Sequence, residues 1–158
     1  MDRPTGLDSP LVPKLLKVMS RANVFLYRRT HGRLGGKFPI AGFRRAVPVC
    51  LVTHQGRKSG RTFTTPLLCL QDGDRVVIVA SQAGMPKNPQ WYLNIRANPR
   101  VTVQTGALVR SMIARTASPE EREVLWPQLV QLYPGWADYQ TWTDRVIPVV
   151  ICEREAAP

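Results

Sequence analysis

Acidic residues, cysteines and long hydrophobic runs are all scarce in this 158-residue sequence, and each scarcity excludes a class of protein. No stretch of about 18 uncharged apolar residues occurs, so we expect no transmembrane helix. The N-terminus lacks an apolar segment followed by a cleavage site, so it does not predict a secretory signal. The chain is 44% apolar and 21% charged, which is typical of one folded domain and excludes a disordered chain.

The three cysteines, Cys50, Cys69 and Cys152, are far apart in the sequence, and each lies within an apolar run. No two of them have the short spacing of a zinc site, and an odd number cannot form a complete disulfide framework. We therefore expect buried, reduced thiols, no metal site and a cytoplasmic protein.

Basic residues are in excess and unevenly distributed. Lys and Arg number 22 against 11 Asp and Glu, a net charge of +11. Residues 1–45 contain ten basic residues and only Asp2 and Asp8, so they carry +8 and the other 113 residues carry +3. This charge favours an anionic partner, and composition alone leaves open nucleic acid, an anionic membrane surface or a polyanionic small molecule.

From Pro10 to Arg29, apolar residues recur at helical spacing with basic residues between them, which predicts a basic amphipathic helix. Two interpretations fit this pattern: a surface helix packed on the domain, or a helix lying on anionic lipid. Glycines over residues 32–36 end the helix. We therefore divide the chain into an N-terminal helix with a Gly-rich loop, residues 1–45, and one folded domain, residues 46–154.

The remaining pattern predicts six strands paired as hairpins. Turn signals at Asp72-Gly73 and at Gly106 separate β-branched runs. Asn88 before Pro89 and Ser118 before Pro119 are typical of helix N-termini. The strands are expected at 47–53, 62–70, 75–81, 100–105, 107–116 and 146–152, and the helices at 89–98, 119–133 and 136–143. Hairpins imply antiparallel pairing, so we expect a mainly β, α+β protein with a small barrel and appended helices.

Three segments are candidates for chemistry. The turn from Gly56 to Arg61 offers basic side chains and a serine hydroxyl to an anion, although it lacks the spacing of a Walker loop. A small-residue strand end at 79–84 leads into the helix that contains Trp91 and Tyr92, of which one should pack in the core and the other could stack on a ring system. Tyr133, Trp136 and Tyr139 recur every three residues and form either core or the wall of a flat-ligand pocket.

No catalytic constellation accompanies these segments. His31 and His54 are far apart and have no serine or aspartate partner pattern, and paired carboxylates are also missing. If the protein is an enzyme, its chemistry therefore comes from a bound cofactor.

Taken together, the ordered motifs resemble those of the deazaflavin-dependent nitroreductase family. The matching segments are GRKSG at 56–60, Thr-Pro-Leu at 65–67, Val-Ala-Ser at 79–81, NPxWYxNIxANP at 88–99, and the ending from Trp126 to Pro148. The resemblance runs from about residue 20 to residue 153. It implies an actinobacterial oxidoreductase that uses coenzyme F420 on an antiparallel split β-barrel similar to that of flavin reductases and pyridoxamine oxidases.

The resemblance also implies roles by motif position. Coenzyme F420 carries a phosphate and an oligoglutamate tail, which the basic turn would hold, while residues 64–68 would line the deazaflavin ring. Tyr133, Trp136 and Tyr139 match the family's aromatic wall over the acceptor, with a tyrosine hydroxyl that hydrogen-bonds to or protonates the product. The cofactor-binding residues implied are Arg57, Lys58, Ser59, Arg61, Phe63, Thr64, Thr65, Pro66, Leu67, Leu68, Val79, Ala80, Ser81, Gln82, Gln90, Trp91, Tyr92, Asn94 and Trp136.

Three positions depart from the family pattern. Phe63 stands where the family often has Arg, with Arg61 nearby as a substitute, and Gln82 stands where Lys often follows the serine. Each lost cation weakens binding of the tail by roughly 1.5–3 kcal/mol. Trp136 replaces a tyrosine of the acceptor wall, which removes a hydroxyl and adds bulk.

We therefore expect an F420H2-dependent reductase that passes a hydride to a planar acceptor such as a quinone or a nitroaromatic. If the acceptor is a quinone dissolved in lipid, we expect the basic helix to hold the protein at the inner face of the cell membrane. The alternatives are a non-catalytic F420-binding protein and an enzyme that uses flavin mononucleotide on the same barrel. Nucleic acid is not expected as a partner, because no exposed aromatics are interleaved with the basic residues. The oligomeric state is left open.

Overall fold

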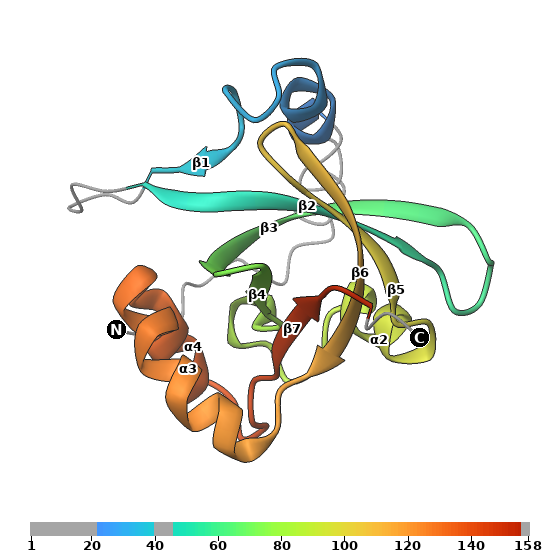
Figure 1. The fold of residues 1–158 in the computed structure, drawn as a ribbon. Helices are drawn as coiled ribbons and strands as arrows, with labels where there is room; N and C mark the ends of the chain where they lie inside the picture. Colours follow the sequence, from blue (N-terminus) through green and yellow to red (C-terminus); the bar gives the residue numbers. More distant parts are fainter. Residues whose placement is uncertain (1–21, 40–45, 156–158) are drawn as a thin grey trace.

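The computed structural model describes residues 22–39 and 46–155. Six strands form one closed antiparallel barrel in the order β2-β3-β4-β7-β6-β5, and β5 pairs back onto β2 (Figure 1). A two-residue strand, β1, pairs with the first residues of β2. The strands are β1 (Lys37–Phe38), β2 (Val47–Gln55), β3 (Thr62–Asp72), β4 (Arg75–Val79), β5 (Arg100–Thr105), β6 (Leu108–Thr116) and β7 (Val149–Glu153). The predicted mainly β, antiparallel barrel with appended helices is confirmed.

Glycine makes the two tight hairpin turns possible. Gly73 between β3 and β4 and Gly106 between β5 and β6 have φ angles of +60° and +62°, which L-residues with side chains rarely adopt. Both turns were predicted. The last strand begins three residues later than predicted, at Val149. Pro148 has no N–H to donate to a neighbouring strand, and the Ile147 N–H donates to the side chain of Gln140 instead.

Helices α2 (Gln90–Ala97), α3 (Pro119–Leu132) and α4 (Gly135–Thr141) and the 3-10 turn η1 (Gln82–Gly84) lie outside the barrel wall. Ser118 forms the predicted capping box, because its hydroxyl accepts from the Glu121 N–H and the Glu121 carboxylate accepts from the Ser118 N–H. The prediction that Asn88 caps α2 was wrong. Pro89 occupies the N-cap position with extended backbone, and the Asn88 side chain accepts a hydrogen bond from Arg145.

Alternation along the strands creates two hydrophobic cores. On β4, Val76 and Ile78 point into the barrel, while Val77 and Val79 point outward. The inner core is closed by residues of α2, and the outer core is covered by α3 and α4, which lie beside β4 and β7 (Figure 1). The helices thus seal one opening and one outer face of the barrel.

The N-terminal helix was predicted to begin at Pro10, and its first half lies outside the described residues. Residues 22–29 are helical and are attached to the barrel through Tyr27, which is 1% exposed. The Tyr27 hydroxyl donates to the Val49 carbonyl and accepts from the Gly106 N–H, both at 2.8 Å. One side chain therefore joins this helix to β2 and to the β5–β6 turn. The domain boundary at residue 45 stays a prediction.

The three cysteine thiols are free and buried in the inner core, as predicted. Burial and the neighbouring Cys69 thiol raise the pKa of Cys50, and burial raises the pKa of Cys152 to about 12. The thiols of Cys50 and Cys152 therefore stay protonated and unreactive at neutral pH. Within residues 22–39 and 46–155, no group of histidine, cysteine and carboxylate side chains is arranged to hold a metal ion.

Candidate functional site

Two pockets lie next to each other along β3. The first, named here the basic pocket, has a volume of about 440 Å³ and is lined by His54, Gly56, Arg57, Lys58, Ser59, Phe63, Thr65, Gln90, Trp91 and Asn94. The second, the aromatic pocket, has a volume of about 500 Å³ and is lined by Asn23, Phe38, Val49, Pro66, Leu67, Leu68, Val79, Ser81, Ala83, Tyr133, Trp136 and Tyr139. Thr65 of the basic pocket and Leu67 of the aromatic pocket lie two residues apart on the same face of β3, so a single extended molecule can contact both.

The turn between β2 and β3 forms one wall of the basic pocket. The Gly56 N–H donates to the Arg61 carbonyl, and the Gly60 N–H donates to the Gly56 carbonyl, which closes the turn. A Cβ atom at Gly56 would lie 2.6 Å from the Phe63 ring and 2.9 Å from the Ser59 hydroxyl. Only glycine therefore fits at the base of this turn while Phe63 keeps its place.

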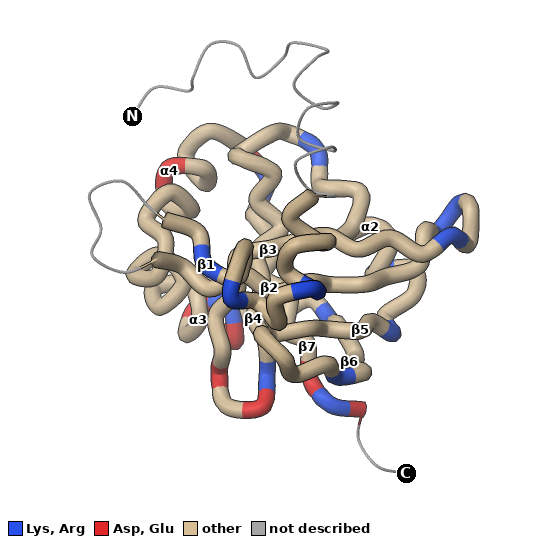
Figure 2. The backbone as a smooth tube through the Cα atoms, turned by 90° about the horizontal axis from the view of Figure 1, so that it is seen from above, with Lys and Arg blue, Asp and Glu red and all other residues tan. Residues whose placement is uncertain are grey.

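The basic side chains of this turn are not neutralised by carboxylates. Arg57 donates from Nη1 to the amide oxygens of Gln90 and Asn94, at 3.0 and 3.2 Å, and neither amide carries charge. Among the described residues, no ion pair involves Arg57 or Lys58. In Figure 2 the loop extending beyond α2 carries basic residues and no acidic one. The pocket thus presents uncompensated positive charge, which favours an anionic ligand.

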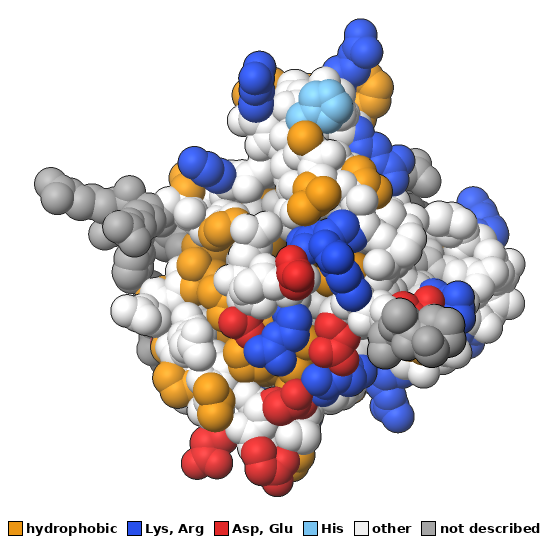
Figure 3. Space-filling view, in the orientation of Figure 1, with side chains coloured by type: hydrophobic (Ala, Val, Ile, Leu, Met, Phe, Trp, Pro, Cys, Tyr) orange, Lys and Arg blue, Asp and Glu red, His pale blue; other side chains and the backbone are white. Residues whose placement is uncertain are grey.

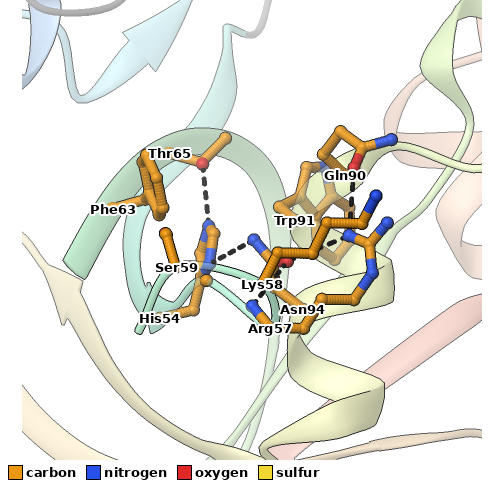
Figure 4. Close-up of a pocket in the computed structure, with 10 residues that line it drawn as sticks. His54, Arg57, Lys58, Ser59, Phe63, Thr65, Gln90, Trp91 and Asn94 are labelled. Carbon is orange, nitrogen blue, oxygen red and sulfur yellow. Dashed lines mark hydrogen bonds between the residues drawn. The ribbon is translucent and has the colours of Figure 1, made fainter. Parts of the chain in front are cut away.

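Below the turn, two buried polar side chains connect α2 with the hairpin. Asn94 is 7% exposed and His54 is 4% exposed. The Asn94 oxygen accepts from both the backbone N–H and the guanidinium of Arg57, at 3.2 Å each, while its nitrogen lies 3.4 Å from His54 Nδ1. His54 Nε2 lies 3.2 Å from the Thr65 hydroxyl (Figure 4). Burial lowers the pKa of His54, so the ring is neutral at pH 7.

The aromatic pocket combines apolar walls with a pair of hydroxyl groups. Pro66, Leu68 and Val79 supply aliphatic surface, while Tyr139 comes from α4 and Tyr133 is the C-cap residue of α3. The two tyrosine hydroxyls lie 3.0 Å apart and share a hydrogen bond. Burial and this bond raise the pKa of Tyr139, so its hydroxyl stays protonated. The pocket can therefore hold a flat apolar ring and offer it a hydroxyl proton.

One edge of the aromatic pocket is a left-handed turn held by a half-buried arginine. Gln82, Ala83 and Gly84 have φ angles of +47°, +51° and +70°, a sequence that costs free energy for the first two residues. Arg145 donates to the carbonyls of Ala80, Ser81 and Met85 and to the Asn88 side chain, and so fixes both ends of the turn. This turn places Ser81 and Ala83 against the pocket.

Most of the predicted site residues line one of these pockets, and five do not. Arg61, Thr64, Ala80, Gln82 and Tyr92 line neither. Thr64 points to the other face of β3, where it bonds to Thr53 and Arg28, and the Tyr92 hydroxyl bonds to Thr116. Both side chains of the predicted aromatic pair on α2 pack in the inner core, and of the two only Trp91 also lines the basic pocket. Trp136 lines the aromatic pocket but is only 3% exposed, because it also packs in the outer core.

Sequence reasoning missed several residues that line the pockets. His54 was set aside because it has no sequence neighbour with a catalytic pattern, yet Thr65, its partner, lies across the hairpin. The alternation of β2 and β3 about the predicted turn was the signal that could have found this pair. The other lining residues that were not among the predicted site residues are Asn23, Phe38, Val49, Gly56 and Ala83, of which the last two lie within the candidate segments.

Comparison with known proteins agrees with this geometry. The family model of the F420H2-dependent quinone reductases matches residues 19–154. Rv3178 of Mycobacterium tuberculosis is 46% identical over 111 residues, which cover 70% of this chain and 93% of that protein. Rv1261c of the same species, named an F420H2-dependent quinone reductase, is 36% identical over 133 residues, 82% of this chain and 85% of that protein.

Two solved structures are similar over most of their own length. An F420H2-dependent reductase, FDR-A, is 46% identical, with a TM-score of 0.63 over 67% of this chain and 94% of that one. A protein described as a domain-swapped dimer is 37% identical, with a TM-score of 0.65 over 89% of this chain and 99% of that one. From the family match over residues 19–154 and these relatives, the chain belongs to the F420H2-dependent quinone reductase family.

Proposed function

We propose that this chain is an F420H2-dependent oxidoreductase that holds the anionic part of coenzyme F420 in the basic pocket and a planar acceptor, such as a quinone, in the aromatic pocket. The observation that carries the proposal is that the two pockets adjoin along β3, where Thr65 lines the basic pocket and Leu67, on the same face of the strand, lines the aromatic pocket. One pocket has the chemistry to bind an anion, and the other has the chemistry to bind a flat ring.

The donor set of the basic pocket fits the proposed cofactor. Arg57 and Lys58 are cations without a carboxylate partner among the described residues, and Ser59 adds a hydroxyl. Gly56 lets the turn lie close to Phe63 and keeps this side of the pocket open. Arg57, Lys58 and Ser59 would hold the phosphate and carboxylates of the cofactor, since charged hydrogen bonds to such oxygens are the strong ones.

The aromatic pocket would orient the acceptor and exclude water. When bound, the reduced deazaflavin supplies a hydride. Pro66, Leu68 and Val79 would hold the acceptor in a fixed position. Such positioning lowers the barrier to hydride transfer between two bound molecules. A quinone that gains a hydride also needs a proton, and the hydroxyls of Tyr133 and Tyr139, which share a hydrogen bond, would supply it.

The cofactor half is tested by titrating the purified protein with oxidised F420 and, in parallel, with flavin mononucleotide, using fluorescence quenching and anisotropy. We expect micromolar or tighter binding of F420 alone, followed by oxidation of F420H2 when a soluble quinone is added. Preference for flavin mononucleotide, or binding of neither molecule, would overturn the assignment of the basic pocket.

We also propose that the surface around residues 22–34 rests on anionic lipid, from which a quinone would reach the aromatic pocket. Phe25, Leu26 and Leu34 are 68%, 44% and 56% exposed. Arg29 and Arg33 lie beside them, and basic side chains surround hydrophobic ones in this region (Figure 3). This mixture is typical of surfaces that lie at a lipid interface. Among the described residues, no helix is long and apolar enough to cross a bilayer.

The lipid proposal is tested by co-sedimentation with vesicles that contain anionic phospholipid. A Phe25→Ser, Leu26→Ser double variant should sediment much less than the unmodified protein. The matched control is Val124→Ser, which removes an equally exposed apolar side chain from α3 and should change nothing. Equal sedimentation of all three proteins would contradict the proposal.

A further inference from the structure

We propose that His54 is a positioning residue, which receives a hydrogen bond from Asn94 and makes the Thr65 hydroxyl a donor into the basic pocket, toward an acceptor oxygen of the bound ligand. Figure 4 shows the connected side chains, from Arg57 through Asn94 and His54 to Thr65. The identity of the ligand as coenzyme F420 rests on the proposed function, whereas the relay itself follows from the side-chain geometry.

Arg57 fixes the orientation of the Asn94 amide. Its backbone N–H and its guanidinium both donate to the same Asn94 oxygen, each over 3.2 Å. The reversed amide would place an NH2 group against two donors and lose both bonds. The nitrogen of Asn94 must therefore point at His54, where it can only donate, and His54 Nδ1 must accept.

The orientation of Asn94 in turn fixes the tautomer of His54. A neutral imidazole has one donor and one acceptor nitrogen, so an accepting Nδ1 leaves the hydrogen on Nε2. Protonation of the ring would set two donors against each other at Nδ1. Burial of the ring at 4% exposure lowers the pKa of His54 and keeps the neutral form. The charged groups that line the same pocket, Arg57 and Lys58, also disfavour a third cation.

Thr65 is the last member of the relay. Nε2–H of His54 donates to the Thr65 hydroxyl oxygen over 3.2 Å, so that oxygen acts as an acceptor. Among the described residues, the Thr65 hydroxyl has no other hydrogen-bond partner, and its own hydrogen remains available. Because Thr65 lines the basic pocket, a ligand oxygen is the partner that this hydrogen can find. A hydroxyl that could otherwise rotate is thereby held as a donor.

Phe63 supports this arrangement from the side. Its ring stacks on the His54 ring, with centroids 6.0 Å apart and an angle of 25° between the planes. Phe63 stands where a basic residue is often found in the resembling family, and here it offers no donor or acceptor that could compete for His54. The stacked ring instead holds the imidazole plane, which directs Nε2 at Thr65.

The tautomer is tested directly, without any ligand, by nitrogen NMR of the histidine side chains. The chain has only two histidines, so a His31→Gln variant assigns the His54 signals. We expect a protonated Nε2 and an unprotonated Nδ1 that persist from pH 7.5 to pH 6. A protonated Nδ1, or a mixture of tautomers, would overturn the relay.

The donor role is tested by F420 binding to variants of Thr65. Loss of one neutral hydrogen bond should weaken binding about five- to tenfold in Thr65→Val, and Thr65→Ser should restore it. Thr102→Val, on the outward face of β5 beside Thr53, is the matched control and should bind normally. Unchanged binding by Thr65→Val, measured on a variant whose thermal unfolding is intact, would refute the donor role.

A double-mutant cycle separates positioning from simple packing. His54→Phe should weaken binding two- to fivefold in the presence of Thr65 and have no further effect in the Thr65→Val background. Additive effects would mean that His54 acts independently of Thr65, and would overturn the proposal. If the unmodified protein fails to bind F420, the proposed function and the ligand named here fall together, while the NMR experiment still decides the relay.

Discussion

Replacing Arg57 by glutamine is the sharpest test of the basic pocket, because the neighbouring Arg61 provides a control of identical charge change. Arg57 lines the pocket and bonds to Gln90 and Asn94, whereas Arg61 lies in the same turn and lines neither pocket. Either substitution lowers the net charge of +11 by one. Any difference between the two variants therefore reports geometry rather than overall charge.

The magnitude follows from the type of contact. A hydrogen bond to a charged group contributes about 1.5–3 kcal/mol, so Arg57→Gln should weaken F420 binding roughly 10- to 150-fold. Arg61 acts only through solvent, where charges about 10 Å apart are largely screened at 0.1 M salt, so Arg61→Gln should cost less than about threefold. Arg57→Lys should fall between them, because it keeps the charge but loses the planar fork that reaches two amide oxygens.

The assay is fluorescence titration of oxidised F420 at several salt concentrations. We expect the dependence of log Kd on log salt to become shallower in Arg57→Gln and to stay unchanged in Arg61→Gln. Thermal unfolding of each variant shows whether loss of the Asn94 contact has disturbed the fold. Equal weakening by the two glutamine variants would refute the reasoning, since it would mean that the pocket attracts the cofactor only through its general positive charge.

Three further predictions concern other parts of the molecule. Tyr27→Phe should lower the free energy of unfolding by about 1–3 kcal/mol in urea denaturation, because it leaves the Gly106 N–H without its partner, and a loss below 0.3 kcal/mol would contradict the role given to this hydroxyl. Burial lowers the pKa of folded His54 below its ordinary value near 6.5, so the unfolded chain binds more protons and stability should fall as pH decreases from about 6.5. Unfolding curves of His54→Phe should lack that decrease between pH 6.5 and 5, and an unchanged slope would argue against it. Tyr139→Phe should reduce quinone turnover while leaving F420 binding within about twofold, and a parallel loss of both would place Tyr139 in the cofactor site instead.

The barrel was largely predictable because hairpin turns have strong local signals. Gly73 and Gly106 mark two turns, and the alternation of the strands between them determines which residues share a face. Ser118 likewise identifies the start of α3 through a capping box that depends on nearby residues alone. The predicted start of α2 was one residue too early and that of β7 three residues too early, because both depend on distant partners. The Asn88 side chain bonds to Arg145, and the N–H of Ile147, just before Pro148, bonds to Gln140.

The site was less predictable because whether a residue lines a pocket depends on how distant segments of the chain pack against it. Arg57 and Arg61 look equivalent in the sequence, and only the position of α2 against the turn distinguishes them. Thr64 and Thr65 are adjacent, yet they point to opposite faces of β3 and only Thr65 lines the basic pocket. Recognising His54 requires the register of the hairpin, which pairs it with Phe63 and brings its ring within hydrogen-bond distance of Thr65.

The use of β3 by both pockets has a consequence for how such proteins can diversify. The basic pocket is built from the barrel's own hairpin and α2, whereas the aromatic pocket takes much of its wall from elements outside the barrel, α4 and residues 23 and 38. If the pockets hold cofactor and acceptor as proposed, substitutions in those outer elements would change which acceptor is reduced while the residues that bind the cofactor stay as they are. Under this proposed assignment, the residues that bind the reductant are separate from those that select the oxidant, and one scaffold would acquire new acceptors without rebuilding its redox site.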